Sequence, residues 1–114
     1  MRRWLAPLGL LGSLGCAHAS PQASAAERQA VIEANLPELQ ACWANVADQY
    51  PGSSGSVVFS VVLRRKGSVD WVEVDVDEIG APKLITCAVR RIKQWQFPAG
   101  SKQTIGFGVG FVSP

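Results

Sequence analysis

Apolar residues recur at helical spacing over residues 27–49. They follow the i, i+3, i+4 pattern of a helix that packs along one face, and Pro37 interrupts the pattern. The segment is therefore either one kinked helix or two helices. If there are two, Asn35 caps the second, and Glu38 three residues later completes a capping box. A loop rich in glycine and serine, residues 51–55, then turns the chain.

A second apolar stripe at helical spacing lies within residues 84–98. Its members are Leu84, Ala88, Ile92 and Trp95, with Ile85 and Val89 beside them. Pro82 suits the first turn of such a helix, and Pro98 forbids its continuation. The pattern predicts a helix that packs along one face and ends before Pro98.

Three segments instead alternate apolar and other residues with the period of a strand: residues 56–64, 69–77 and 104–112. Gly67 lies in the loop between the first two, where a hairpin needs a positive φ. The core-facing positions are predicted to be Val57, Phe59, Val61, Leu63, Val72, Val74, Val76, Ile105, Phe107, Val109 and Phe111. The order α-β-β-α-β predicts an α+β two-layer sandwich, in which two helices cover one face of a three-stranded antiparallel sheet.

The last predicted strand alternates apolar residues with glycine and carries no charge. An uncharged strand edge is prone to pair with another strand, so a partner that adds a strand there is one interpretation. The other is that the glycines only let the strand twist or pass under another element. The candidate partner-binding edge consists of Ile105, Gly106, Phe107, Gly108, Val109 and Gly110.

The first residues resemble an export signal. Arg2 and Arg3 precede an apolar run, residues 4–14, which is too short to span a bilayer. We expect a signal peptide over residues 1–15, followed by a lipidated Cys16 and a flexible tether to residue 26. Cleavage after Ala19, at an A-x-A site, is the alternative. The favoured location is the periplasmic face of the outer membrane, with a soluble periplasmic or secreted protein as the alternative.

Charge and composition exclude several classes of function. Of eleven basic residues two are Arg2 and Arg3, so the rest of the chain has nine basic and nine acidic residues and no basis for binding nucleic acid. His18 is the only histidine and lies in the predicted tether, so no catalytic pair can be built on histidine. We expect no enzyme activity and no cofactor. The acidic residues Glu73, Asp75, Asp77 and Glu78 are interpreted as a solvated face rather than a calcium site.

Two cysteines remain once Cys16 is assigned to lipid. Cys42 and Cys87 lie in the two predicted helices. In an oxidising compartment such an even pair favours a disulfide, although two separate buried thiols are the alternative.

From about residue 28 onward the chain resembles the TonB C-terminal-like domains, and within them the AgmX/PglI C-terminal family. The matching segments are Leu39-x-x-Cys42-Trp43, Tyr50-Pro51-x-x-x-Gly55-x-Val57-x-Phe59, Gly67-x-Val69, Cys87-x-x-x-x-Ile92-x-x-Trp95-x-Phe97-Pro98, and the final strand from Phe107 to Phe111. The resemblance implies a domain over residues 27–114 and a disulfide between Cys42 and Cys87. It also implies binding of partner strands at the sheet edge, but not the energy transduction of true TonB proteins.

Three functional hypotheses follow. The first is a non-enzymatic periplasmic lipoprotein, held in the membrane by its lipid, that binds an unidentified periplasmic or outer-membrane protein. The second is a structural component of an envelope or gliding-motility assembly that acts through its helical face. A hydrolytic enzyme is a remote third hypothesis.

Overall fold

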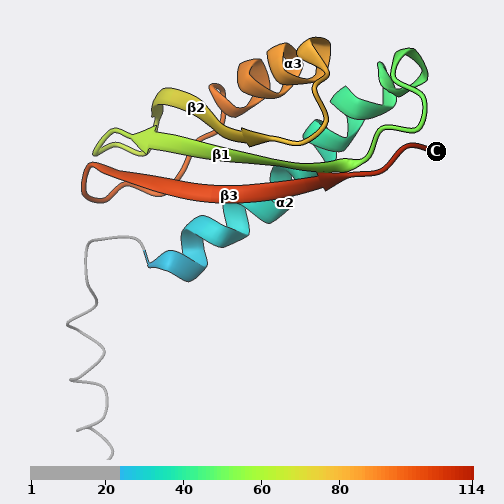
Figure 1. Ribbon diagram of the computed structural model, residues 1–114. Helices are drawn as coiled ribbons and strands as arrows, with labels where there is room; N and C mark the ends of the chain where they lie inside the picture. The colour runs from blue at the N-terminus through green and yellow to red at the C-terminus, as the bar shows by residue number, and fades with distance from the viewer. Residues whose placement is uncertain (1–23) are drawn as a thin grey trace, which may run out of the picture.

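The computed structural model describes residues 24–114 as one α+β sandwich (Figure 1). Its elements in chain order are helix α2 (Ala25–Ala44), the short 3₁₀ helix η1 (Ala47–Gln49), strands β1 (Gly55–Leu63) and β2 (Val69–Asp77), helix α3 (Pro82–Ile92) and strand β3 (Gln103–Phe111). The antiparallel sheet has the order β2-β1-β3. The predicted fold class is therefore confirmed.

Helix α2 is one continuous helix through Pro37. It begins at Ala25, two residues earlier than predicted, because Ser24 and Glu27 form the capping box that closes its first turn. The alternative of two helices, with Asn35 as the cap of the second, is therefore wrong. The Asn35 side chain instead donates 2.8 Å to the carbonyl of Val31, one turn back in the same helix.

Strand β1 is central, and its odd-numbered residues from Val57 to Leu63 are buried as predicted. Strand β3 pairs with it over nine residues without a register shift. Strand β2 differs, because its register against β1 shifts twice. A one-residue shift moves side chains to the other face, so Val72 is buried but Val76 is 44% exposed, contrary to the regular alternation predicted.

Helix α3 ends at Ile92, earlier than the sequence pattern predicted. The following residues are held by the β1–β2 hairpin instead. Gln96 forms an isolated bridge with Ser68, and the Phe97 N–H donates 2.9 Å to the Gly67 carbonyl. Trp95 and Phe97 are thereby buried as part of an extended segment that closes the end of the core.

The core lies between the sheet and the two helices. Its fully buried side chains include Phe59, Phe97, Phe111, Leu39, Leu84, Ile92, Val57 and Val61. A disulfide joins Cys42 of α2 to Cys87 of α3, with the Cα atoms 5.8 Å apart. The two helices are thus covalently tied over the same face of the sheet, as predicted.

Candidate functional site

The outer edge of β3 offers unpaired backbone groups at alternate residues. Ser56 of β1 directs its N–H and C=O to Glu78, on the β2 side. Because these directions alternate along an antiparallel strand, the residues of β1 that bond β3 are Val57, Phe59 and Val61. The β3 partners of these residues use their backbone N–H and C=O groups in hydrogen bonds to β1. The β3 residues between those partners point their backbone groups away from the sheet.

The six predicted edge residues therefore fall into two sets. Ile105, Phe107 and Val109 pair with β1 and turn their side chains toward the core. Gly106, Gly108 and Gly110 are exposed and direct N–H and C=O outward. Of these six residues only the glycines direct backbone groups away from the sheet, as Thr104 before them does.

Helix α2 covers one end of this edge. The Gln40 side chain donates 3.0 Å to the Gly110 carbonyl, and the Trp43 indole donates 2.9 Å to the Val112 carbonyl. In the part of the chain that the structure describes, no side chain is recorded as bonding the backbone of Gly106 or Gly108. The open part of the edge thus spans Thr104 to Gly108.

The opposite edge of the sheet, β2, is protected in ways that β3 is not. It has two register shifts and carries Glu73, Asp75 and Asp77. Charges and bulges are the usual features that stop edge strands from pairing with other chains. Strand β3 has neither, so of the two edges it is the one suited to accept a strand.

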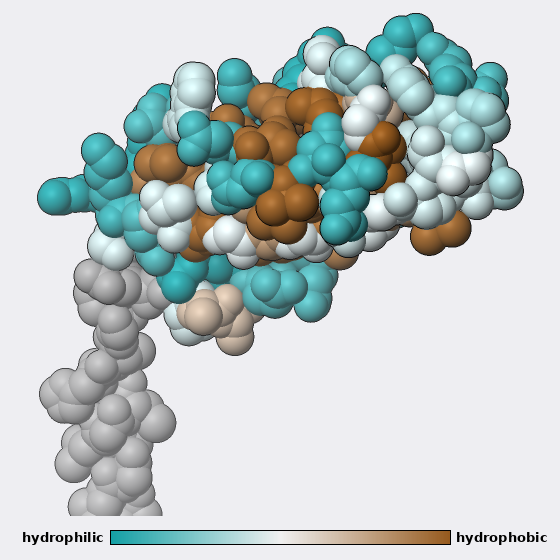
Figure 2. All heavy atoms as spheres, in the orientation of Figure 1, coloured by the Kyte–Doolittle hydropathy of each residue, from teal (hydrophilic) through white to brown (hydrophobic). Residues whose placement is uncertain are grey.

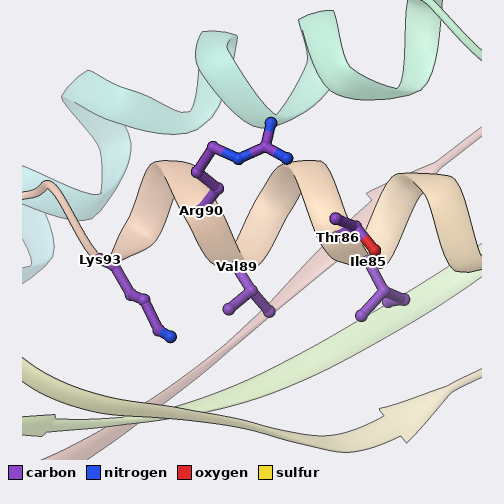
Figure 3. Close-up of a pocket in the computed structure, with 5 residues that line it drawn as sticks. All are labelled: Ile85, Thr86, Val89, Arg90 and Lys93. Atoms are coloured by element: carbon purple, nitrogen blue, oxygen red, sulfur yellow. The ribbon is translucent and has the colours of Figure 1, made fainter.

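A groove along α3 was not predicted from the sequence. It has a volume of about 480 Å³ and is lined by Ile85, Thr86, Val89, Arg90 and Lys93 (Figure 3). Ile85 and Val89 are half-buried, whereas Arg90 and Lys93 are exposed. The apolar stripe of α3 is wider than the core requires, and that excess width was the signal for the groove in the sequence.

Three acidic residues in or next to β2 accept hydrogen bonds from neighbouring groups of the protein. Asp77 accepts 2.9 Å hydrogen bonds from the N–H groups of Ile79 and Gly80, and Glu78 accepts one from Ser56. Asp75 accepts a hydrogen bond from the Ser60 hydroxyl. Within residues 24–114 no group of three or more histidine, cysteine or acidic side chains is placed to hold a metal ion.

Several predicted features lie outside the described residues: the signal peptide, Cys16, His18 and most of the tether. Ser24 caps α2, and residues 25 and 26 belong to this helix rather than to the tether. No helix within residues 24–114 is long and apolar enough to cross a membrane.

Comparisons of the chain with protein-family models, curated proteins and solved structures found no match. The candidate site is therefore defined by its geometry: an uncharged, unbulged strand edge, Thr104 to Gly108, beside a helix that caps one end of it.

Proposed function

We propose that this protein is a non-enzymatic interaction module with a TonB C-terminal-like fold, which binds a partner protein by adding a strand of that partner to β3. The observation that carries the proposal is the contrast between the two sheet edges. Strand β2 is charged and bulged, whereas β3 presents outward backbone groups at Gly106 and Gly108 with no charge nearby on the strand.

An added strand would also find a surface to pack on. Figure 1 shows α2 passing behind β3 and extending beyond it on the side away from β1. Val31 and Leu36 of α2 are half-buried against the core, and Gln40 reaches the end of β3. Side chains of a docked strand that face the helical layer would contact α2, while those on the other face would lie beside bare glycines.

The fold and the disulfide between the helices are what the resemblance to the TonB C-terminal-like domains implies, and they support that part of the proposal. We further propose that Cys16 carries lipid and holds the protein at the periplasmic face of the outer membrane, where the partner is a periplasmic or outer-membrane protein. The alternative, an assembly component that acts through its helical face, draws support from the groove on α3.

The docking edge is tested by replacing Gly108 with proline. Proline removes the outward N–H and leaves the hydrogen bonds between β3 and β1 intact. We therefore expect partner capture from native envelopes to fall at least about tenfold. The free energy of unfolding should change by less than about 1 kcal/mol. Capture is measured by cross-linking with the wild-type and variant proteins side by side.

Gly108→Ala is the matched control. It keeps the N–H, and its Cβ would lie 3.6 Å from the Val58 side chain, an ordinary contact, so capture should equal that of the wild type. A folded Gly108→Pro protein that captures its partner as well as the wild type would refute docking at β3. Capture lost on changing Arg90 and Lys93 instead would favour the helical face.

The lipid anchor is tested separately. Cys16→Ser should move the protein from the membrane fraction to the soluble periplasm, because the thioether-linked lipid can no longer form. The measurement is fractionation followed by N-terminal sequencing. A wild-type protein that is already soluble and begins at Ser20 would show cleavage at the A-x-A site instead.

A further inference from the structure

The groove on α3 combines an apolar floor with a cationic rim. Val89 and Ile85 point toward the sheet side of the groove, while Arg90 and Lys93 extend from the helix in different directions (Figure 3). In Figure 2 apolar residues gather near the middle of the molecule, with hydrophilic residues on either side. A ligand for this surface must therefore offer apolar contact and negative charge together.

Trp71 of β2 extends this surface at the end of α3. Its side chain is 55% exposed, and the Lys93 ammonium lies 5.9 Å from the centre of its ring. The indoles of Trp43 and Trp95 donate to Val112 and Glu38. No hydrogen bond is recorded for the Trp71 indole among residues 24–114. Tryptophan and arginine are enriched among the residues that dominate binding energy at interfaces, and a lysine over a tryptophan ring forms a cation–π contact.

Among residues 24–114 no carboxylate forms an ion pair with Arg90 or Lys93 of the groove. Over residues 24–114 the one recorded ion pair joins Arg64 to Asp70, at the hairpin. The carboxylates of β2 do not come within ion-pair distance of Arg90 or Lys93, although β2 contacts α3. Two positive charges over an apolar floor, neither of them in an ion pair within residues 24–114, are complementary to a segment that carries both carboxylates and apolar side chains.

We propose that the groove formed by Ile85, Thr86, Val89, Arg90 and Lys93, with Trp71 at its end, binds an acidic amphipathic segment of a partner protein. The site lies at the β2 side of the sheet, whereas the proposed strand-docking edge lies on β3. The groove is therefore a second binding site, and it can be tested independently of strand addition at β3.

Two other occupants fit the charges less well. Residues 1–23 of this chain contain no aspartate or glutamate and include Arg2 and Arg3, so they would repel the rim. An anionic membrane surface is held by clusters of about four to eight basic residues. The chain after Arg3 has equal numbers of basic and acidic residues, and the groove carries two cations. A short acidic segment of a protein therefore matches these two cations better than an anionic membrane surface does.

The test uses a synthetic amphipathic peptide of twelve residues, with leucine along one helical face and glutamate along the other, and a counterpart with lysine for glutamate. Each is titrated into ¹⁵N-labelled protein, and the Trp71 indole signal is assigned with Trp71→Phe. We expect the acidic peptide to shift this indole and the backbone amides of α3, and the basic peptide to leave both unchanged.

The double variant Arg90→Glu, Lys93→Glu should weaken binding of the acidic peptide at least tenfold, since attraction becomes repulsion. Its matched control is Arg65→Glu, Lys66→Glu, which makes the same change of charge on the exposed hairpin loop and should bind like the wild type. The side chains of Arg90 and Lys93 are exposed, so the double variant should fold. A dispersed amide spectrum, like that of the wild type, checks this. Arg90→Gln, Lys93→Gln provides a milder second variant, with an expected loss of about threefold or more.

Three outcomes would overturn the proposal. Equal weakening by the hairpin control would show attraction by general charge rather than by the groove. Shifts confined to β3 would place the peptide at the other edge. Shifts of Trp71 and α3 caused by phosphatidylglycerol vesicles, but not by the acidic peptide, would assign the groove to a membrane surface.

Discussion

Replacing both Cys42 and Cys87 with alanine should lower the free energy of unfolding by about 4 kcal/mol. The bond closes a loop between residues 45 apart in sequence, and for such a loop the chain-entropy estimate lies between about 3 and 4.7 kcal/mol. A domain of this size has a net stability of about 5–10 kcal/mol, so the loss removes a large part of it. Urea unfolding followed by far-UV circular dichroism measures the change.

The wild-type protein treated with a reducing agent is the control for this variant. It should lose a similar amount of stability, since it keeps both sulfur atoms and loses only the bond. Alanine is preferred to serine because Cys42 is buried, where an unpaired hydroxyl would add its own cost. A loss below about 1 kcal/mol in both samples would show that the bond does not restrict the unfolded chain as expected.

Gly67→Ala should destabilise the protein by about 3 kcal/mol or more. Gly67 has φ +91°, and an added Cβ would lie 1.9 Å from the Phe97 carbonyl oxygen, a position that only a backbone movement can relieve. That movement would break the bond from the Phe97 N–H to Gly67 and loosen Phe97 and Trp95 in the core. Thermal or urea unfolding gives the size of the effect.

Gly52→Ala distinguishes the cost of the positive φ from the cost of the clash with the Phe97 carbonyl. Gly52 has φ +77°, similar to that of Gly67, but an added Cβ there would meet nothing within 4 Å. It should cost only the left-handed backbone penalty, about 1–2 kcal/mol. Equal losses for the two variants would mean that the contact between the hairpin and residue 97 contributes nothing beyond backbone strain.

The periodic part of the fold could be predicted from the sequence. Alternation along β1 and β3 identified which side chains face the core, because a strand with one buried face must follow a period of two. The helical stripe in α3 identified Leu84, Ala88 and Ile92 for the same kind of reason. The pairing of Cys42 with Cys87 was predicted from their even number and from the family resemblance, and the structure confirms it.

Places where contacts with a distant segment override the helical or strand pattern were harder to predict. The helical pattern of α3 continues to Trp95, yet the helix ends at Ile92 because the hairpin offers backbone partners to Gln96 and Phe97. Those partners are about thirty residues away in sequence. The register shifts that expose Val76 likewise depend on how β2 pairs with β1. The pattern of residues within β2 alone does not reveal that pairing.

The sequence by itself therefore determined the element order, the buried faces of β1 and β3, and the absence of charge on the last strand. Only the tertiary structure decided that Gly106 and Gly108 turn their backbone outward while Gly110 is bound by Gln40. It alone placed Trp71 beside Lys93. The physical reason is that side-chain period is a property of one segment, whereas strand order, register and free backbone groups depend on which segments become neighbours.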